Sequence, residues 1–423
     1  MVACLLLATA CTSGGRLDAG GSPMDGAPAS DAGSPPPPPD AATCHGTVEG
    51  QVRLPNGIHS AAGALVYVAG EAGERPLTGE CGQCVAYESV LAHALTDAAG
   101  RFELSLPAGT HEIIIQKGGD ERRVEASVAC DGTTTLATEA VRLPRTVEEG
   151  RVPRMAVIDG IYDSMELVLA RMGLGELAID GAGLSVVDPP FDFYFAPVGA
   201  IADVPPIPTD EQRSLLRDPE RLAAYDIVFI SCGAELVEPA TPGFAGSLLF
   251  EPGVQQNLRD YVENGGRLYV TDLEYTLIEQ IWPQAIDFAH GSGDGLSAEP
   301  ETPYLANRGE GFFETDARVV DTDLLRWLTT NGVAASATIP IQGLVPGWVM
   351  MDRHASVVRR WVERDERPLT VSFAAGCGRV VYSSYHLEEG FSRRFSELPI
   401  PEEAILAYLI FQIGECIADP ELI

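Results

Sequence analysis

The stretch that decides the fold of the larger part of the chain runs from Asn257 to Glu274 and reads NLRDYVENGGRLYVTDLE. Residues 254–263 have helical spacing, and the Asn-Gly-Gly turn that follows is a typical helix end. Residues 267–271 then form an apolar strand, and the acids Asp272 and Glu274 follow directly. The pattern predicts a helix, a turn and a strand whose end carries carboxylates.

The same alternation of helices and apolar strands extends on both sides of this stretch. Unbroken apolar strands between helices predict a parallel sheet that is covered on both faces. Ligands of such sheets bind beyond the carboxyl ends of the strands. The further predicted strands are 154–159, 225–231 and 379–385. The further predicted helices are 163–172, one contained in 317–330 that ends at the Asn-Gly turn 331–332, and 401–414.

The region before residue 145 follows a different pattern, with short runs that alternate apolar and polar residues between Gly and Pro turns. This spacing predicts an antiparallel β-sandwich. The turn 97–100 is expected to be a structural feature of it. The predicted strands are 48–54, 64–68, 101–106 and 111–116.

Residues 44–145 also resemble a known module. GTVEGQVRLPNG, AAGALVYV and TDAAGRFELSLPAGTHEIIIQ are similar to the carboxypeptidase regulatory-like (transthyretin-like) module. This resemblance implies the sandwich fold and an accessory role without activity of its own. CGQC together with IIIQKGGDERRVEASVAC resembles a type of predicted myxobacterial lipoprotein.

Residues 152–421 resemble the class I glutamine amidotransferase-like fold through YDIVFIS, LRDYVENGGRLYVTD and GCGRVVYSSYHLE. The resemblance implies a flavodoxin-like α/β domain, whose active members carry Gly-x-Cys-x-Gly and a later His-x-Glu pair that activates the cysteine. His386 and Glu388 match the pair, but Asp272 stands where the cysteine is expected. Cys232 follows another strand and lacks the motif. Glutamine hydrolysis is therefore not expected.

Asp272 and Glu274 have three interpretations, of which the favoured one is a helix cap. Thr271 would cap a helix that starts at Asp272, and Glu274 would reach back to complete a capping box. The same device is predicted at Asp163 and Glu166. On this interpretation the acids are structural.

The second interpretation is a divalent metal site formed by Asp159, Asp272, Glu274, His386 and Glu388, where the strands end. Carboxylates suit Ca²⁺, and a histidine permits Zn²⁺ or Mn²⁺. The third is a pair of carboxylates for acid-base hydrolysis. The candidate catalytic residues are accordingly His386, Glu388, Asp272, Glu274 and Cys232, without a confident choice among them.

Seven cysteines follow the signal region, and an oxidising compartment would pair most of them. Within residues 44–145 the CGQC motif also permits a redox pair or half of a zinc site. The four cysteines of this region allow three disulfide pairings, and all three are open. Cys232 would be left as a buried apolar side chain or, less favoured, a reactive thiol. The favoured pairs are Cys44–Cys130, Cys81–Cys84 and Cys377–Cys416.

The first 43 residues predict export and tethering. Residues 1–11 contain a short apolar run that is too short to span a bilayer and ends at Cys11. Ala8 to Cys11 resembles a lipobox, which implies lipidation of Cys11 and, with Thr12 next, outer-membrane sorting. Residues 12–43 are rich in Gly, Ala, Ser and Pro and cannot bury enough surface to fold.

The net charge of −33 over 423 residues argues against binding to nucleic acid or to anionic lipid. The sequence thus predicts an exported, lipid-anchored envelope protein whose amidotransferase-like domain acts in binding or recognition, with carbohydrate or envelope material as the candidate ligand. No cofactor is predicted beyond a candidate divalent cation, and the oligomeric state is open. The rival hypotheses are a metal-dependent hydrolase and a structural envelope component.

Overall fold

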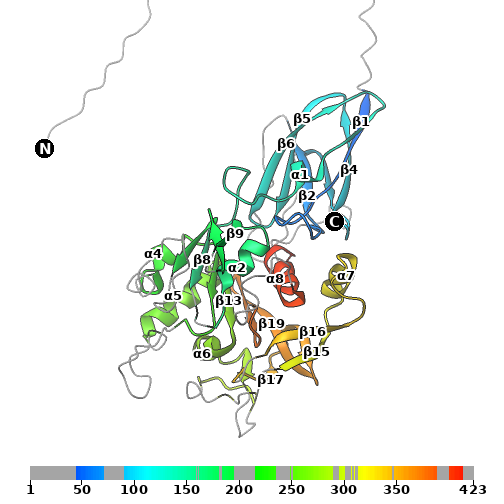
Figure 1. Ribbon diagram of the computed structural model, residues 1–423. Coiled ribbons are helices and arrows are strands. Elements are labelled where there is room, and N and C mark those ends of the chain that lie inside the picture. Colours follow the sequence, from blue (N-terminus) through cyan, green and yellow to red (C-terminus); the bar gives the residue numbers. More distant parts are fainter. Residues whose placement is uncertain are drawn as a thin grey trace, which may run out of the picture. The chain divides into compact units, whose positions relative to one another are not determined.

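A computed structural model of the chain shows two groups of strands with helices around the second group (Figure 1). Residues 1–43, including Cys11, lie outside the described part. No helix in the described part is long and apolar enough to cross a membrane. The described residues are 44–70, 90–158, 160, 162–180, 183–194, 215–234, 248, 251–288, 295–300, 306, 309, 313–344, 347–387 and 400–412.

The first group of strands forms a β-sandwich. One sheet has the order β4-β1-β7 and the other has the order β3-β2-β5-β6. The pairing is antiparallel, as predicted, except that β7 runs parallel to β1. The strands are β1 (His45–Gln51), β2 (Leu65–Ala69), β3 (Val90–Leu95), β4 (Arg101–Pro107), β5 (Gly109–Lys117), β6 (Asp120–Val128) and β7 (Thr133–Thr135), and the short α1 (Thr138–Val141) follows them.

The sandwich core follows from the two-residue period of its strands. Val48 of β1 and Leu104 of β4 contribute to one hydrophobic cluster with Val66 of β2 and Ile113 and Ile115 of β5. Each of these side chains is almost completely buried. Burying an aliphatic side chain of this size contributes roughly 1.5–3 kcal/mol, so these inward-facing residues stabilise the packing of the two sheets.

The second group is built on a nine-stranded sheet of order β11-β8-β12-β13-β20-β19-β18-β15-β16. The five strands from β11 to β20 are parallel, but the last four are antiparallel to their neighbours. The sheet is therefore mixed, and the prediction of a parallel sheet holds for one half of it. These strands are β8 (Met155–Ile158), β11 (Phe191–Tyr194), β12 (Ile227–Ile230), β13 (Arg267–Thr271), β15 (Phe313–Val319), β16 (Thr338–Leu344), β18 (Arg359–Arg364), β19 (Arg367–Ala375) and β20 (Gly378–Ser383).

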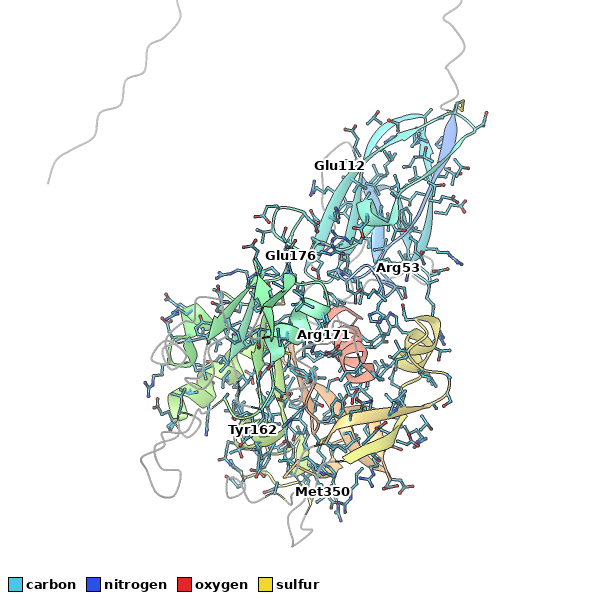
Figure 2. The ribbon with its side chains drawn as sticks, viewed as in Figure 1. Arg53, Glu112, Tyr162, Arg171, Glu176 and Met350 are labelled. Carbon is cyan, nitrogen blue, oxygen red and sulfur yellow. A yellow bond between two sulfur atoms is a disulfide. The ribbon has the colours of Figure 1, made fainter. Side chains whose placement is uncertain are left out.

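Helices cover both faces of the parallel half (Figure 1). Alternate residues of β8 and β12 join two different cores, one with α2 and α8 and the other with α5 and α6. Arg171, labelled in Figure 2, links α2 to α8 through a buried ion pair with Glu403 at 2.6 Å. The helices are α2 (Met165–Arg171), α4 (Pro219–Leu222), α5 (Pro252–Glu263), the 3-10 turn η2 (Asp272–Glu274), α6 (Tyr275–Ile281), α7 (Thr322–Thr330) and α8 (Pro401–Gln412).

The helix predicted within residues 317–330 is confirmed as α7, and the residues before it form a strand. Ala317 and Val319 are buried while Arg318 between them is exposed, which is the two-residue period of a strand, and they belong to β15. The helix α7 begins only after Asp321, whose carboxylate caps it by accepting from the N–H groups of Asp323 and Leu324.

Two smaller pairings complete the described strands. An antiparallel hairpin joins β9 (Glu176–Asp180) to β10 (Gly183–Val187), and β14 (Ile286–Phe288) pairs antiparallel with β17 (Met351–His354). The β-sandwich also touches α7, because the indole N–H of Trp327 donates to the carbonyl oxygen of Ser60 at 2.9 Å.

Candidate functional site

The candidate site lies where three neighbouring parallel strands end. β12, β13 and β20 are adjacent and parallel, and their carboxyl ends lead to Cys232, Asp272 and His386. The sulfur of Cys232, a carboxylate oxygen of Asp272 and a ring nitrogen of His386 all lie within 4.8 Å of one another. The structure thus brings together three of the predicted candidates from positions 40 to 154 residues apart.

Asp272 is the centre of this cluster. Its backbone φ is 40°, in the left-handed region that costs a non-glycine residue about 1 kcal/mol or more. Its Oδ1 accepts from the backbone N–H of Val349 at 2.7 Å, and its Oδ2 lies 3.0 Å from Nε2 of His386. The hydroxyl of Tyr382 donates to its carbonyl oxygen at 3.0 Å. The sharp turn is therefore held by partners that are distant in sequence.

Two glycines let the backbone close around the cluster. A Cβ on Gly160 would lie 2.1 Å from the carbonyl oxygen of Cys232, and a Cβ on Gly343 would lie 1.9 Å from that of His386. The N–H of His386 donates to the carbonyl oxygen of Gly343 at 2.8 Å. A side chain at either glycine would push these strand ends apart.

The 3-10 turn η2 begins at Asp272 after Thr271, as predicted, but the side chains of Asp163 and Thr271 make no capping bond, so the capping-box prediction is wrong at both places. The hydroxyl of Thr271 donates to Oδ2 of Asp163 at 2.6 Å and accepts from the N–H of Cys232 at 2.8 Å. Oδ1 of Asp163 accepts from the N–H of Leu387 at 3.1 Å. These bonds connect the ends of β8, β12, β13 and β20. A capping box would instead have bonded only to the free N–H groups at the start of its own helix.

Glu274 also differs from its predicted roles. Its carboxylate accepts from the backbone N–H groups of Gly233 and Ala234, and it neither reaches back to the strand end nor joins the metal-ligand cluster. Burial raises its pKa to about 7, against the lowering effect of these two bonds. Glu274 therefore holds the loop after β12 in place.

Burial dominates the electrostatics of the cluster. It raises the pKa of Asp272, while the hydrogen bonds from His386 and Val349 act in the opposite direction. It also raises the pKa of the Cys232 thiol, and the nearby Asp272 and Asp163 carboxylates raise it further. Since the thiolate is the nucleophilic form, Cys232 is held in its unreactive state.

Tyr162 covers the cluster on one side. Its ring stacks on that of His386 with centroids 6.1 Å apart and planes 19° apart (Tyr162 is labelled in Figure 2). Tyr162 is half exposed, whereas Cys232, Asp272 and His386 are at most 1% exposed. The cluster is therefore enclosed. No sequence pattern pointed to Tyr162 or to the backbone N–H of Val349 as its neighbours.

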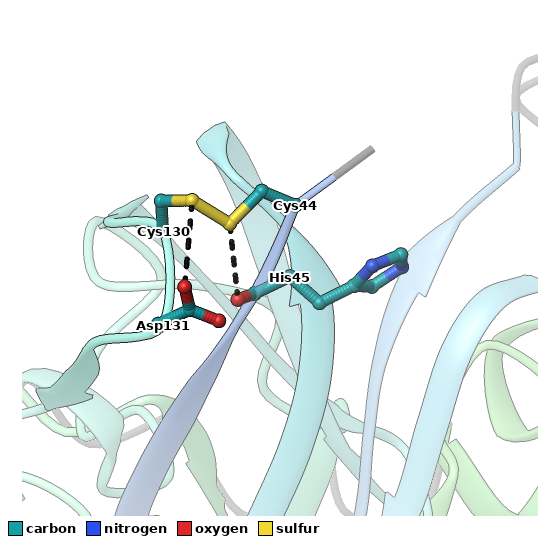
Figure 3. Close-up of a disulfide and its surroundings, with 4 residues drawn as sticks. All are labelled: Cys44, His45, Cys130 and Asp131. Atoms are coloured by element: carbon teal, nitrogen blue, oxygen red, sulfur yellow. Dashed lines mark hydrogen bonds between the residues drawn. A yellow bond between two sulfur atoms is a disulfide. The ribbon is translucent and has the colours of Figure 1, made fainter. Parts of the chain in front are cut away.

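The cysteines outside the cluster behave as structural residues where the structure describes them. Cys44 and Cys130 form the predicted disulfide, which joins the start of β1 to the end of β6 (Figure 3). This bond excludes a zinc site made of thiolates of both residues. Cys377 is disulfide-bonded, and Cys232 is a free thiol, as predicted. Several predicted residues lie outside the described part: Cys81, Cys84, Cys416, Asp159 and Glu388.

Comparisons with known proteins give distant similarities. No family model and no curated protein matches the chain. Among solved structures, a cytoplasmic protein of Salmonella typhimurium, STM3548, is 13% identical with a TM-score of 0.34, over 63% of this chain and 100% of that one. A glutamine amidotransferase is 17% identical with a TM-score of 0.27, over 49% and 95%. The minor pilin GBS52 of Streptococcus agalactiae is 14% identical with a TM-score of 0.17, over 26% and 46%.

Each of these three solved structures is less than 20% identical to this chain. Their TM-scores are too low to support any conclusion about function. The site is therefore judged by its own geometry.

Proposed function

We propose that this chain is an exported, lipid-anchored envelope protein whose amidotransferase-like domain recognises a ligand and does not hydrolyse glutamine. Cys11 and the Pro-rich segment 12–43 would supply the anchor and the tether, and the β-sandwich would be an accessory module. The observation that carries the proposal is the identity and environment of Asp272, the residue that follows β13.

Asp272 stands at the left-handed turn where the resemblance implies a nucleophilic cysteine. Both of its carboxylate oxygens are engaged, one by Val349 and the other by His386. His386, the residue that would activate a nucleophile, is therefore committed to a carboxylate. The nearby thiol of Cys232 is buried, and its pKa is raised. This geometry supports a domain that binds a ligand and does not hydrolyse glutamine.

A glutamine analogue that carries a chloroketone or diazoketone tests this part of the proposal. Intact-mass analysis should find no adduct on the purified chain, and no ammonia should be released from glutamine. An Asp272→Cys variant is treated with the same analogue for comparison, because it places a thiol at the left-handed turn beside His386. An adduct on Cys232 or Asp272 of the unmodified chain would contradict the proposal.

An open groove of about 520 Å³ is the candidate recognition surface. It lies near the start of β20, and thus at the opposite end of the parallel strands from the Asp272 cluster. Trp282 and Phe373 line it and pack edge to face at 5.8 Å, and Arg259 and Gln284 add polar groups. Phe373 is buried and supports the partly exposed ring of Trp282. An aromatic ring beside a few polar groups favours small polar ligands with apolar faces, which is the surface pattern of sugars.

Binding to envelope polysaccharide tests this groove. The purified chain should co-sediment with insoluble cell-wall polysaccharide, and Trp282→Ala should weaken that binding at least about tenfold if its ring forms the platform. Leu91→Ala, which removes an exposed side chain of the β-sandwich, is the matched control and should bind normally. Equal binding by the unmodified chain and Trp282→Ala would reject the groove as the recognition surface.

The lipid anchor has its own test. Replacing Cys11 by Ala should move the protein from the membrane fraction to the soluble fraction, and it should remove the mass of the acyl chains. Cys4→Ala is the matched control, because Cys4 lies within the proposed signal. Membrane association that survives Cys11→Ala would contradict lipidation at that residue.

A metal-dependent hydrolase is the second candidate, since Asp272 and His386 do converge. Hydrolysis requires that substrate reaches the ion, but the cluster is enclosed and stacked beneath Tyr162. Recognition is therefore the better-supported function. Turnover of ester or glycoside substrates that is lost with chelator and with Asp272→Asn would reverse this order. A structural envelope component would bind no polysaccharide and show no turnover.

A further inference from the structure

We propose that Cys232, Asp272 and His386 form a binding site for one transition-metal ion, with Zn²⁺ as the best match. The three residues come from the ends of β12, β13 and β20, which are adjacent strands. Each offers one ligand atom, and these atoms lie within 4.8 Å of one another. This site goes beyond the proposed recognition function and does not depend on it.

The distances between the ligand atoms suit a small tetrahedral ion. Nε2 of His386 lies 3.0 Å from Oδ2 of Asp272, and Sγ of Cys232 lies 3.8 Å from the same oxygen. Bonds of roughly 2.0–2.3 Å to zinc place tetrahedral ligand atoms roughly 3.3–3.6 Å apart. Shifts of a few tenths of an ångström would bring these two pairs to tetrahedral spacing, and the sulfur of Cys232 and the ring nitrogen of His386 lie within 4.8 Å of each other.

The types of ligand select the ion. A thiolate and an imidazole are poor ligands for Ca²⁺ and Mg²⁺, which prefer sets of oxygen atoms, but they are common ligands of Zn²⁺. Binding would release the proton of the Cys232 thiol to solvent. The proton between Nε2 of His386 and Oδ2 of Asp272 would either leave or move to Nδ1. Three protein ligands leave a fourth position for water.

The surroundings hold the three ligands in place. The N–H of Val349 fixes the second oxygen of Asp272, and the hydroxyl of Thr271 accepts from the backbone N–H of Cys232. Hydrogen bonds of this kind orient metal ligands, and their loss typically costs 10–100-fold in affinity. A second group of possible ligands, Cys44, Cys130 and Asp131, is not comparable, because its two sulfurs are joined in a disulfide.

The test is metal titration of the full chain after chelator treatment. One Zn²⁺ per chain should bind and raise the unfolding temperature, because the ion would bind the folded state alone. One Co²⁺ should give the charge-transfer absorption of a cobalt–thiolate bond. Cys232→Ser should abolish that absorption, and Asp272→Asn and His386→Gln should each weaken binding at least about tenfold. Asp131→Asn is the matched control and should bind like the unmodified chain.

Two results would overturn the site: a folded chain that binds no stoichiometric Zn²⁺ or Co²⁺, or a thiolate absorption that persists in Cys232→Ser. If a variant fails to fold, as judged by circular dichroism, the spectrum of the Co²⁺-loaded unmodified chain still decides whether a thiolate is a ligand. The outcome is separate from the glutamine-analogue and polysaccharide experiments, which need no metal.

Discussion

Asp97 and Asp272 both stand at turns beside strands, but they are held in opposite ways. Asp97 is exposed before β4, and its Oδ1 accepts from the N–H groups of Ala99 and Arg101, each at 2.8 Å. Asp272 is buried after β13, and the partners of its carboxylate lie 77 and 114 residues further along the chain. The same residue type thus closes a local turn in one place and joins distant strand ends in the other.

The difference separates what a local sequence can specify from what it cannot. The five consecutive residues 97–101 contain Asp97 and both of its hydrogen-bond partners, so this turn could form without the rest of the fold. Asp272 is stable in its left-handed conformation only because the surrounding structure supplies its partners. Four predictions test this contrast, from the largest expected effect to the smallest.

Asp272→Ala should lower the free energy of unfolding by about 3 kcal/mol or more, because it removes the buried acceptor of the Val349 N–H and the buried carboxylate beside the ring of His386. Asp272→Gly should be about 1 kcal/mol less damaging, since glycine adopts the left-handed φ without strain. Urea unfolding measures the free energy of unfolding of both variants. Asp131, which is exposed with a φ of 55°, is the control, and its alanine variant should lose far less. Equal losses of unfolding free energy in Asp272→Ala and Asp131→Ala would contradict the contrast between local and distant partners.

Gly100→Ala should lower the free energy of unfolding by about 2–3 kcal/mol. The φ of Gly100 is 78°, and an added Cβ would lie 2.2 Å from the backbone oxygen of Val52. Gly253 is the matched control, because an added Cβ there meets nothing within 4 Å, and its alanine variant in α5 should be neutral or stabilising. Thermal unfolding of the two variants provides the measurement. Similar melting temperatures would show that the turn 97–100 tolerates a side chain.

His59 lies between these extremes, since it packs against Asn56 nearby in sequence and against the ring of Trp327 at 5.3 Å. Burial, and then the charge of Arg53, lowers the pKa of His59 from 6.5 to about 4. Between these values the unfolded chain binds a proton that the folded chain does not. Stability should therefore fall with decreasing pH by roughly 1.4 kcal/mol per pH unit, or about 2 kcal/mol at pH 5.

Urea midpoints at pH 7 and pH 5 test the role of His59, with His59→Gln as the comparison. The glutamine variant should lose this part of the pH dependence while it keeps a hydrogen-bonding side chain. If both proteins lose the same stability between the two values, His59 is not the titrating group.

Asp97→Ala should have the smallest effect, about 1 kcal/mol, because the exposed N–H groups of Ala99 and Arg101 can turn to water. Asp97→Asn keeps an acceptor oxygen and should recover most of that loss. Hydrogen exchange at Ala99 should report the loss of the bond directly. A loss as large as that of Asp272→Ala would mean that the turn is not locally determined.

The sequence predicted some parts of the fold closely, and particular residues show why. Strand 267–271 has the predicted bounds, because an apolar run follows a Gly-Gly turn and the whole signal is local. The Asp97 turn and the Cys44–Cys130 pair were also predicted. The helix predicted within 317–330 is α7, and it ends at Thr330, directly before the predicted Asn-Gly stop.

The candidate site was predicted only as a set of residue types. Asp272, His386 and Cys232 were singled out because each follows an apolar strand, and parallel strands end at one edge of a sheet. Only the folded chain shows that Asp272 contacts His386 and that Thr271 donates a hydrogen bond to Asp163. It also shows that Glu274 accepts from the backbone N–H of Gly233. A capping box and a tertiary hydrogen bond use the same donors, so the local pattern could not choose between them.

By itself the sequence determined the β-sandwich, the parallel half of the larger sheet and the residue types at its edge, because periodicity and turn chemistry act over a few residues. Only the tertiary structure decided that the sheet continues with antiparallel strands and that Asp272 meets His386, Cys232 and Val349. Those contacts join chain segments many residues apart, and buried polar groups take whichever partners the packing of the strands brings to them.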